Sequence, residues 1–118
     1  MSGSLRRGDI RAYEAGSGEK TRLVVVLTRN GAIPFLPGIM VAPVTTVVRG
    51  LPSEVALQAD LGLKAPAVAN LDAVMTVSRA RLGGLAGRLS ADRLRQVGAA
   101  LRVATGYESD ERGVNSAS

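Results

Sequence analysis

The segment that most restricts the fold is a run of five consecutive aliphatic residues, Leu23 to Leu27, within the sequence TRLVVVLT. The run is too short for a typical buried helix and is rich in β-branched valine, so it predicts a strand over 21–28. Because neither face carries a polar residue, such a strand is buried on both faces or closes a small barrel. The 118 residues of the chain suffice for one compact domain around it.

Shorter apolar segments, separated by Gly, Pro and Asn, predict further strands at a spacing that is typical of a small antiparallel barrel. The segment 39–48 contains Pro43, which predicts an edge strand or a bulge at that point because proline lacks an N–H. The expected strands cover 8–14, 21–28, 39–48, 54–58, 67–71, 74–77 and 85–89.

The end of the chain follows a helical pattern instead. Ser90 is a good N-cap and Gly106 a good terminator, and the arginines between them lie off the apolar stripe, on the expected solvated face. Strands followed by one amphipathic helix predict a mainly β, α+β domain over 1–106, with a polar tail over 107–118 that is expected to be disordered. The stripe consists of Leu94, Val97, Leu101 and Ala104.

Composition removes several kinds of chemistry. The chain has no Cys and no His, which excludes disulfides, thiolate nucleophiles, Ser-His-Asp triads and Cys- or His-based metal sites. The lack of Cys fits a cytoplasmic protein, no apolar run is long enough to span a membrane, and the N-terminus lacks the apolar part of a secretory signal.

The charge points to an acidic partner. The net charge is +5, and 13 of the 15 basic residues are Arg, which forms two-pronged contacts with phosphates and carboxylates. Without the last twelve residues, which hold three acids and one Arg, the net charge rises to +7. Nucleic acid or an acidic protein segment is favoured as a partner, although a merely basic soluble protein is equally compatible with charge alone.

The segment VAPVTTVVRG places Thr45, Thr46 and Arg49 where an apolar strand ends. Threonine suits strands through its β-branched side chain, so β-propensity alone is one explanation. Hydroxyl groups beside an arginine also suit a bound phosphate, which is the second.

Three segments in order resemble a known family: Gly8-Asp9-Ile10, the APVTT strand end followed by RGLPSEV, and NLDAVMTVSRARL over 70–82. Over residues 6–104 the chain resembles the MazF/PemK toxin endoribonucleases of type II toxin–antitoxin modules. The resemblance implies an SH3-like or plug β-barrel with a C-terminal helix, and a homodimer. It also implies sequence-selective cleavage of single-stranded RNA without metal or cofactor, and inhibition by an acidic, MazE-like antitoxin.

The resemblance also implies a site. Arg22 matches the family's catalytic arginine, although the Pro that usually follows is Leu23 here, and Thr45 matches its catalytic threonine. Arg22 is expected to contact the scissile phosphate, to stabilise its charge and to be a possible acid. Thr45 is expected to position and stabilise the phosphate. Four further residues are expected to contact RNA, one of which, Glu19, is also a possible base: Glu19, Lys20, Thr46 and Arg49.

Other roles stay open beside these. Each of the expected site residues is also compatible with an ordinary surface position. Asp9 is expected to make a structural hydrogen bond at the start of the first strand, and Asp72 matches an acidic position of the family, with Ala73 in place of the usual Gln. The same barrel serves CcdB-type toxins that bind DNA gyrase, so a non-catalytic toxin, a binding-only relative or a basic interaction module are the alternatives. Arg22 and Thr45 favour the nuclease.

Overall fold

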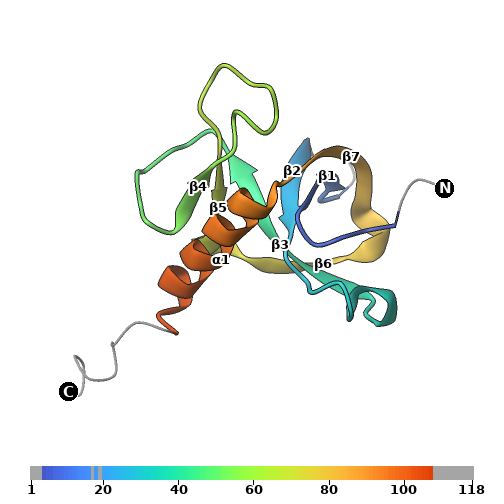
Figure 1. The fold of residues 1–118 in the computed structure, drawn as a ribbon. Helices are drawn as coiled ribbons and strands as arrows, with labels where there is room; N and C mark the ends of the chain where they lie inside the picture. Colours follow the sequence, from blue (N-terminus) through green and yellow to red (C-terminus); the bar gives the residue numbers. More distant parts are fainter. Residues whose placement is uncertain (1–3, 17, 19, 108–118) are drawn as a thin grey trace.

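The computed structural model describes residues 4–16, 18 and 20–107, which form one antiparallel sheet and a C-terminal helix (Figure 1). The mainly β, α+β architecture expected from the sequence is confirmed. The strands are β1 (Asp9–Glu14), β2 (Thr21–Val26), β3 (Gly38–Thr45), β4 (Glu54–Ala56), β5 (Val68–Asn70), β6 (Met75–Ser78) and β7 (Leu82–Arg88). The helix is α1 (Ala91–Thr105), and three short 3-10 helices are η1 (Ile33–Phe35), η2 (Leu71–Ala73) and η3 (Arg79–Arg81).

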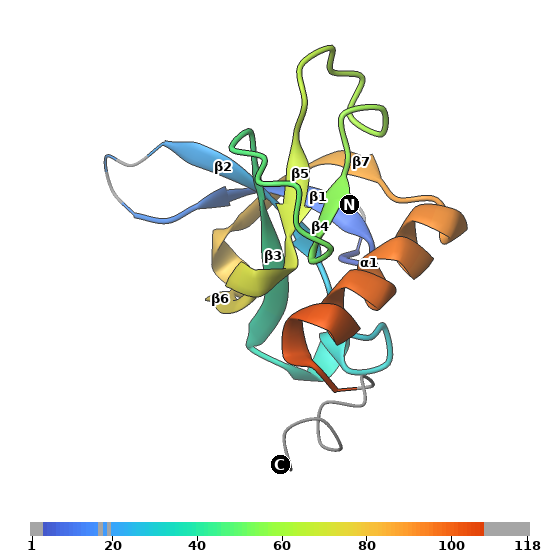
Figure 2. The same cartoon turned by 90° about the vertical axis from the view of Figure 1, so that its left-hand side faces the viewer.

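The sheet has seven strands in the order β4-β5-β3-β2-β1-β7, with β6 paired to β3 beside β5. It curls, and α1 lies across it next to β4 and η2 (Figures 1 and 2). The pairing does not close into a full barrel: in the part of the chain that the structure describes, β4 pairs with β5 alone and β7 with β1 alone.

Strand β2 explains the aliphatic run, because alternate residues enter two different hydrophobic clusters. Val24 and Val26 are fully buried in one cluster, and Val25 is fully buried in the other, which includes Val97 and Ala100 of α1. Burying a valine side chain stabilises the fold by about 1.5–3 kcal/mol. The expectation of a strand that is buried on both faces is confirmed.

Strand β3 corrects the expectation of an edge strand at Pro43. Its one side pairs with β2, where Pro43 lies opposite Val24. Its other side pairs with β6 as far as Val41 and with β5 from Val44 onward. Pro43 is therefore inside the sheet. It lies between the last residue of β3 that pairs with β6 and the first that pairs with β5, so its missing N–H is tolerated there.

The same strand ends at Thr45, three residues earlier than the expected end at Val48. The Thr45 hydroxyl oxygen accepts a hydrogen bond of 3.0 Å from the backbone N–H of Val47, and Val47 is 62% exposed. Such a local bond from a side chain to the backbone competes with a sheet ladder, so the chain turns away after Thr45.

Helix α1 begins and ends as the sequence predicts. The Ser90 hydroxyl accepts the backbone N–H of Arg93 at 3.1 Å, and Gly106 closes the helix in the left-handed region at φ 70°. Arg93, expected on the solvated face, instead forms an ion pair of 2.8 Å with Asp60 in the loop between β4 and β5.

Two expectations concern the chain as a whole: the absence of a membrane span and the division into a domain and a tail. Within the described residues, no helix is long and apolar enough to cross a membrane. Residues 108–118, nearly the whole of the expected disordered tail, lie outside the described residues, so the division into a domain over 1–106 and a tail stays a prediction.

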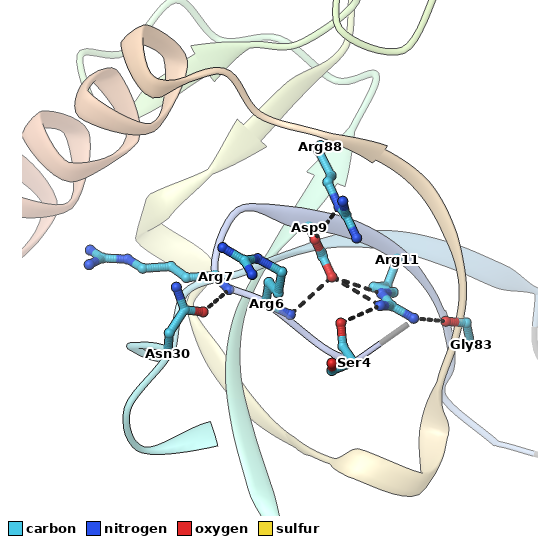
Figure 3. Close-up of polar contacts among 8 residues, drawn as sticks. All are labelled: Ser4, Arg6, Arg7, Asp9, Arg11, Asn30, Gly83 and Arg88. Atoms are coloured by element: carbon cyan, nitrogen blue, oxygen red, sulfur yellow. Dashed lines mark hydrogen bonds and ion pairs between the residues drawn. The ribbon is translucent and has the colours of Figure 1, made fainter. Parts of the chain in front are cut away.

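An ion cluster with a buried centre joins β1 to β7, where the side chain of Arg88 is 54% exposed (Figure 3). The Asp9 carboxylate, fully buried, accepts from Arg11 at 3.0 and 3.2 Å and from Arg88 at 3.2 Å. Arg11 is itself buried and also donates to the backbone carbonyls of Ser4 and Gly83. Every charge in the interior of this cluster therefore has a partner, and Asp9 makes the structural contacts expected of it.

Candidate functional site

A pocket of about 280 Å³ opens at the ends of β3 and β5, beside the start of β2. It brings together Arg22, Thr45 and Arg49, three of the six residues expected in the site. Its lining consists of Arg22, Pro43, Val44, Thr45, Val47, Arg49 and Asn70.

Arg22 reaches the pocket from β2. It lies opposite Tyr13 of β1 and its side chain is exposed. Leu23, which stands where the family has proline, pairs with Ala12 and packs against the core cluster under α1. The departure from the family's motif thus leaves the strand regular at Arg22.

Thr45 is held at the end of β3. Its backbone pairs with Val68 of β5, and its hydroxyl oxygen accepts the N–H of Val47. One lone pair of the hydroxyl oxygen is engaged in this way, whereas the hydroxyl proton remains available to a ligand. The geometry therefore suits a donor that positions an anion better than it suits a base.

Arg49 is placed by a carboxylate that the sequence reasoning did not single out. Glu54 accepts hydrogen bonds from the backbone N–H groups of Arg49 at 3.1 Å, Gly50 at 2.9 Å and Leu51 at 3.3 Å. Gly50 takes the left-handed conformation, at φ 74°, that this tight turn requires. The bonds fix the backbone of the loop while the Arg49 side chain stays exposed at the pocket.

The electrostatics of the pocket favour an anion. Two guanidinium groups and a hydroxyl line it, and its lining contains no carboxylate. Among the residues that the structure describes, neither the Arg22 nor the Arg49 side chain forms an ion pair. Guanidinium groups match the oxygens of a phosphate, and unpaired ones leave their donors free for it.

The remaining expected residues are absent from the lining of this pocket or lie outside the described residues. Lys20 and Thr46 are exposed and are not part of the lining. Glu19 lies outside the described residues. Asp72 accepts a hydrogen bond of 2.5 Å from the Ser53 hydroxyl, which gives it a structural contact.

Asn70 lines the pocket although it was not expected there. Its side-chain oxygen accepts the backbone N–H of Asp72, a bond that the sequence Asn-Leu-Asp allows but that does not by itself indicate a site.

A second hollow, of about 500 Å³, lies between β3, η2 and the end of α1. It is larger, but its lining is mostly apolar and includes none of the residues expected in the site. Nor do the described residues gather three Asp or Glu side chains in a way that could hold a metal ion.

Comparison with known proteins identifies the family to which the sequence was similar. The family model described as PemK-like, MazF-like toxin of type II toxin–antitoxin system matches residues 6–105. The chain is 46% identical over 84 residues to the probable endoribonuclease MazF5 of Mycobacterium tuberculosis, an alignment that covers 70% of this chain and 77% of that protein.

Solved structures of MazF proteins have the same fold. The Mycobacterium tuberculosis toxin MazF-mt6 superposes with a TM-score of 0.74 at 35% identity, covering 83% of this chain and 96% of that one. A MazE-MazF structure from Deinococcus radiodurans superposes with a TM-score of 0.72 at 25% identity, covering 86% and 95%. The family match, the identity and the shared fold together confirm the resemblance seen in the sequence: the chain belongs to the PemK-like, MazF-like toxins of type II toxin–antitoxin systems.

Proposed function

We propose that this toxin is an endoribonuclease that cleaves single-stranded RNA, without a metal, in the pocket lined by Arg22, Thr45 and Arg49. The observation that carries the proposal is the set of unpaired donors at that pocket, which has no carboxylate in its lining. The relative MazF5 is named a probable endoribonuclease, which supports RNA as the substrate.

The reaction that such donors favour uses the ribose 2′-hydroxyl as the nucleophile. Its oxygen gives up its proton to a base and bonds to the adjacent phosphorus, while the bond from phosphorus to the 5′-oxygen breaks. The departing 5′-oxygen takes up a proton, for which Arg22 is the candidate donor, so the products are a 2′,3′-cyclic phosphate and a 5′-hydroxyl. Negative charge builds up on the phosphoryl oxygens in the transition state, and the site must stabilise it. DNA lacks the nucleophile, so it is not a substrate.

Each residue has a role in this proposal. Arg22 stabilises the phosphoryl charge with a permanent cation and a fork of donors. Thr45 donates a hydrogen bond from its hydroxyl group to a phosphate oxygen, and Arg49 binds the phosphate from the loop. Glu19 is the candidate acceptor of the 2′-hydroxyl proton, and Lys20 and Thr46 contact the RNA strand beyond the pocket.

The donor set of the pocket supports cleavage without a metal ion. Divalent ions in nucleases are held by carboxylates, and the lining of this pocket offers guanidinium groups and a hydroxyl. Two cations at the pocket repel a metal ion and perform the charge stabilisation that the ion would otherwise supply.

The basic pocket also suggests a protein partner. We place an acidic, MazE-like antitoxin segment over the basic pocket, because opposite charge would block RNA there. The Deinococcus radiodurans relative was solved as MazE-MazF, which supports such a pairing. Assembly as a homodimer and a cytoplasmic location, where RNA is available, belong to the proposal.

The test is to incubate the purified protein with a long single-stranded RNA in EDTA and to map the product ends. The proposal predicts cuts at discrete positions with 5′-hydroxyl products, and no cut where the nucleotide before the scissile bond carries 2′-deoxyribose. A protein that arrests growth without cutting RNA would contradict it and favour a CcdB-type binding toxin.

A further inference from the structure

Asn70 lines the pocket from the end of its strand and also caps the short helix η2 that follows. It is the last residue of β5, lies opposite Glu54 of β4, and is only partly buried. It lines the pocket together with Arg22, Thr45 and Arg49. Its position therefore puts a neutral amide among two cations and a hydroxyl.

The orientation of this amide is fixed by the turn that follows. The Asn70 side-chain oxygen accepts the backbone N–H of Asp72 at 3.0 Å. Asp72 is itself held, because its carboxylate accepts the Ser53 hydroxyl at 2.5 Å and the neighbouring N–H of Leu71 donates to the Ser53 carbonyl at 3.0 Å. The turn that sets the Asn70 side chain is thus tied to the β3–β4 loop.

Because the oxygen of the amide is engaged, its nitrogen is the free end. The Asn70 NH2 group carries two donors, and it makes no hydrogen bond to any other residue in the part of the chain that the structure describes. A donor whose direction is already set loses little freedom on binding, so it is suited to recognise a fixed acceptor.

We propose that Asn70 is a further substrate-contacting residue, whose NH2 group donates to an acceptor oxygen of the nucleotide bound in the pocket. The inference rests on the proposed function, since it names RNA as the ligand. A phosphate oxygen and a base carbonyl can both accept this hydrogen bond, but they affect sequence selectivity differently. A phosphate contact strengthens binding of every sequence, whereas a base contact selects one.

Two neutral substitutions separate this contact from a merely structural role. Asn70→Ser keeps an oxygen that can accept the Asp72 N–H but shortens the side chain and removes the amide donors. Asn70→Ala removes both the acceptor and the donors. Neither substitution adds a charge, so repulsion of RNA does not enter the comparison.

The experiment measures kcat and KM on RNA for both variants and wild type. It also measures Kd for a strand of the same sequence with 2′-deoxyribose at the cleaved nucleotide. We expect Asn70→Ser and Asn70→Ala each to weaken binding of that strand by about tenfold, with unchanged thermal unfolding of Asn70→Ser. Cleavage positions mapped on a long RNA then identify the acceptor: a uniform loss indicates phosphate, and a changed choice of positions indicates a base.

Binding by Asn70→Ser within about twofold of wild type would overturn the inference, and so would a loss confined to Asn70→Ala, because it would assign Asn70 to the turn alone. Failure of the proposed function is recognised separately. In that case wild type does not cleave RNA, yet the deoxyribose strand still reports whether Asn70 contacts a bound nucleic acid.

Discussion

Arginine appears in two regions of this toxin in opposite circumstances. In the cluster between β1 and β7, Arg11 is buried and its charge is matched by the buried carboxylate of Asp9 (Figure 3). At the pocket, Arg22 and Arg49 are exposed and, among the described residues, form no ion pair.

The difference shows what each region is built to do. A buried guanidinium must be neutralised and hydrogen-bonded, so the Asp9 cluster is complete in the absence of any ligand. An exposed guanidinium is solvated by water and can exchange that water for a phosphate oxygen. The first region is therefore expected to govern folding, and the second to govern activity.

The largest effect on stability is expected from Asp9→Asn. The substitution leaves the buried Arg11 without its counter-charge, so the free energy of unfolding should fall by about 3–5 kcal/mol. Denaturant unfolding measures the change. If stability falls by less than about 1 kcal/mol, the cluster does not depend on its charge pairing, and the contrast with the pocket is broken.

Thr45→Val should lower kcat/KM on RNA by about 10- to 100-fold, because the hydroxyl donor to the phosphate is removed. Thr45→Ser is the matched control, since it keeps both the donor and the acceptor for the Val47 N–H. If Thr45→Ser retains activity, the loss in Thr45→Val is due to the missing hydroxyl group. Equal losses in the two variants would assign it to the shape of the strand end instead.

Glu54→Gln should lower kcat/KM by about tenfold, because the amide weakens the bonds that hold the backbone of the Arg49 loop. If Glu54 acts through Arg49, the double variant with Arg49→Ala loses no more activity than Arg49→Ala alone. Additive losses in this cycle would show that Glu54 has a separate function.

The smallest effect is expected from Asp92→Asn on α1. Asp92 pairs with Arg95, and both side chains are more than two-thirds exposed. Removing the charge should change the free energy of unfolding by less than about 0.5 kcal/mol. A loss close to that of Asp9→Asn would show that burial does not separate structural from surface arginines here.

Much of the fold was predictable because its signals are local. The aliphatic run through Val25 fixes a two-sided strand, and Ser90 and Gly106 mark the ends of the helix. The end of β3 was not predictable. Threonine suits both a continuing strand and a turn in which its hydroxyl accepts a backbone N–H, and the Thr45–Val47 bond decides for the turn. Pro43 misled for a related reason: the position at which β3 changes partner depends on strands far along the chain.

The candidate site was predictable only in part. The resemblance supplied Arg22 and Thr45, and the chemistry of phosphate supplied a reason for Arg49. Glu54 and Asn70 were missed because their hydrogen bonds hold short turns and do not by themselves indicate a site. Asn70 comes to the pocket of Thr45 through the pairing of β5 with β3, whose residues are far apart in the sequence.

The central claim is that the unpaired charge of Arg22 serves catalysis and not folding. The measurement that tests it most directly compares Arg22→Ala with wild type, in RNA cleavage and in denaturant unfolding of the same preparations. The account predicts that cleavage falls by about 10²- to 10³-fold while the free energy of unfolding stays within about 0.5 kcal/mol. Cleavage within about threefold of wild type, in a variant that remains folded, would contradict it.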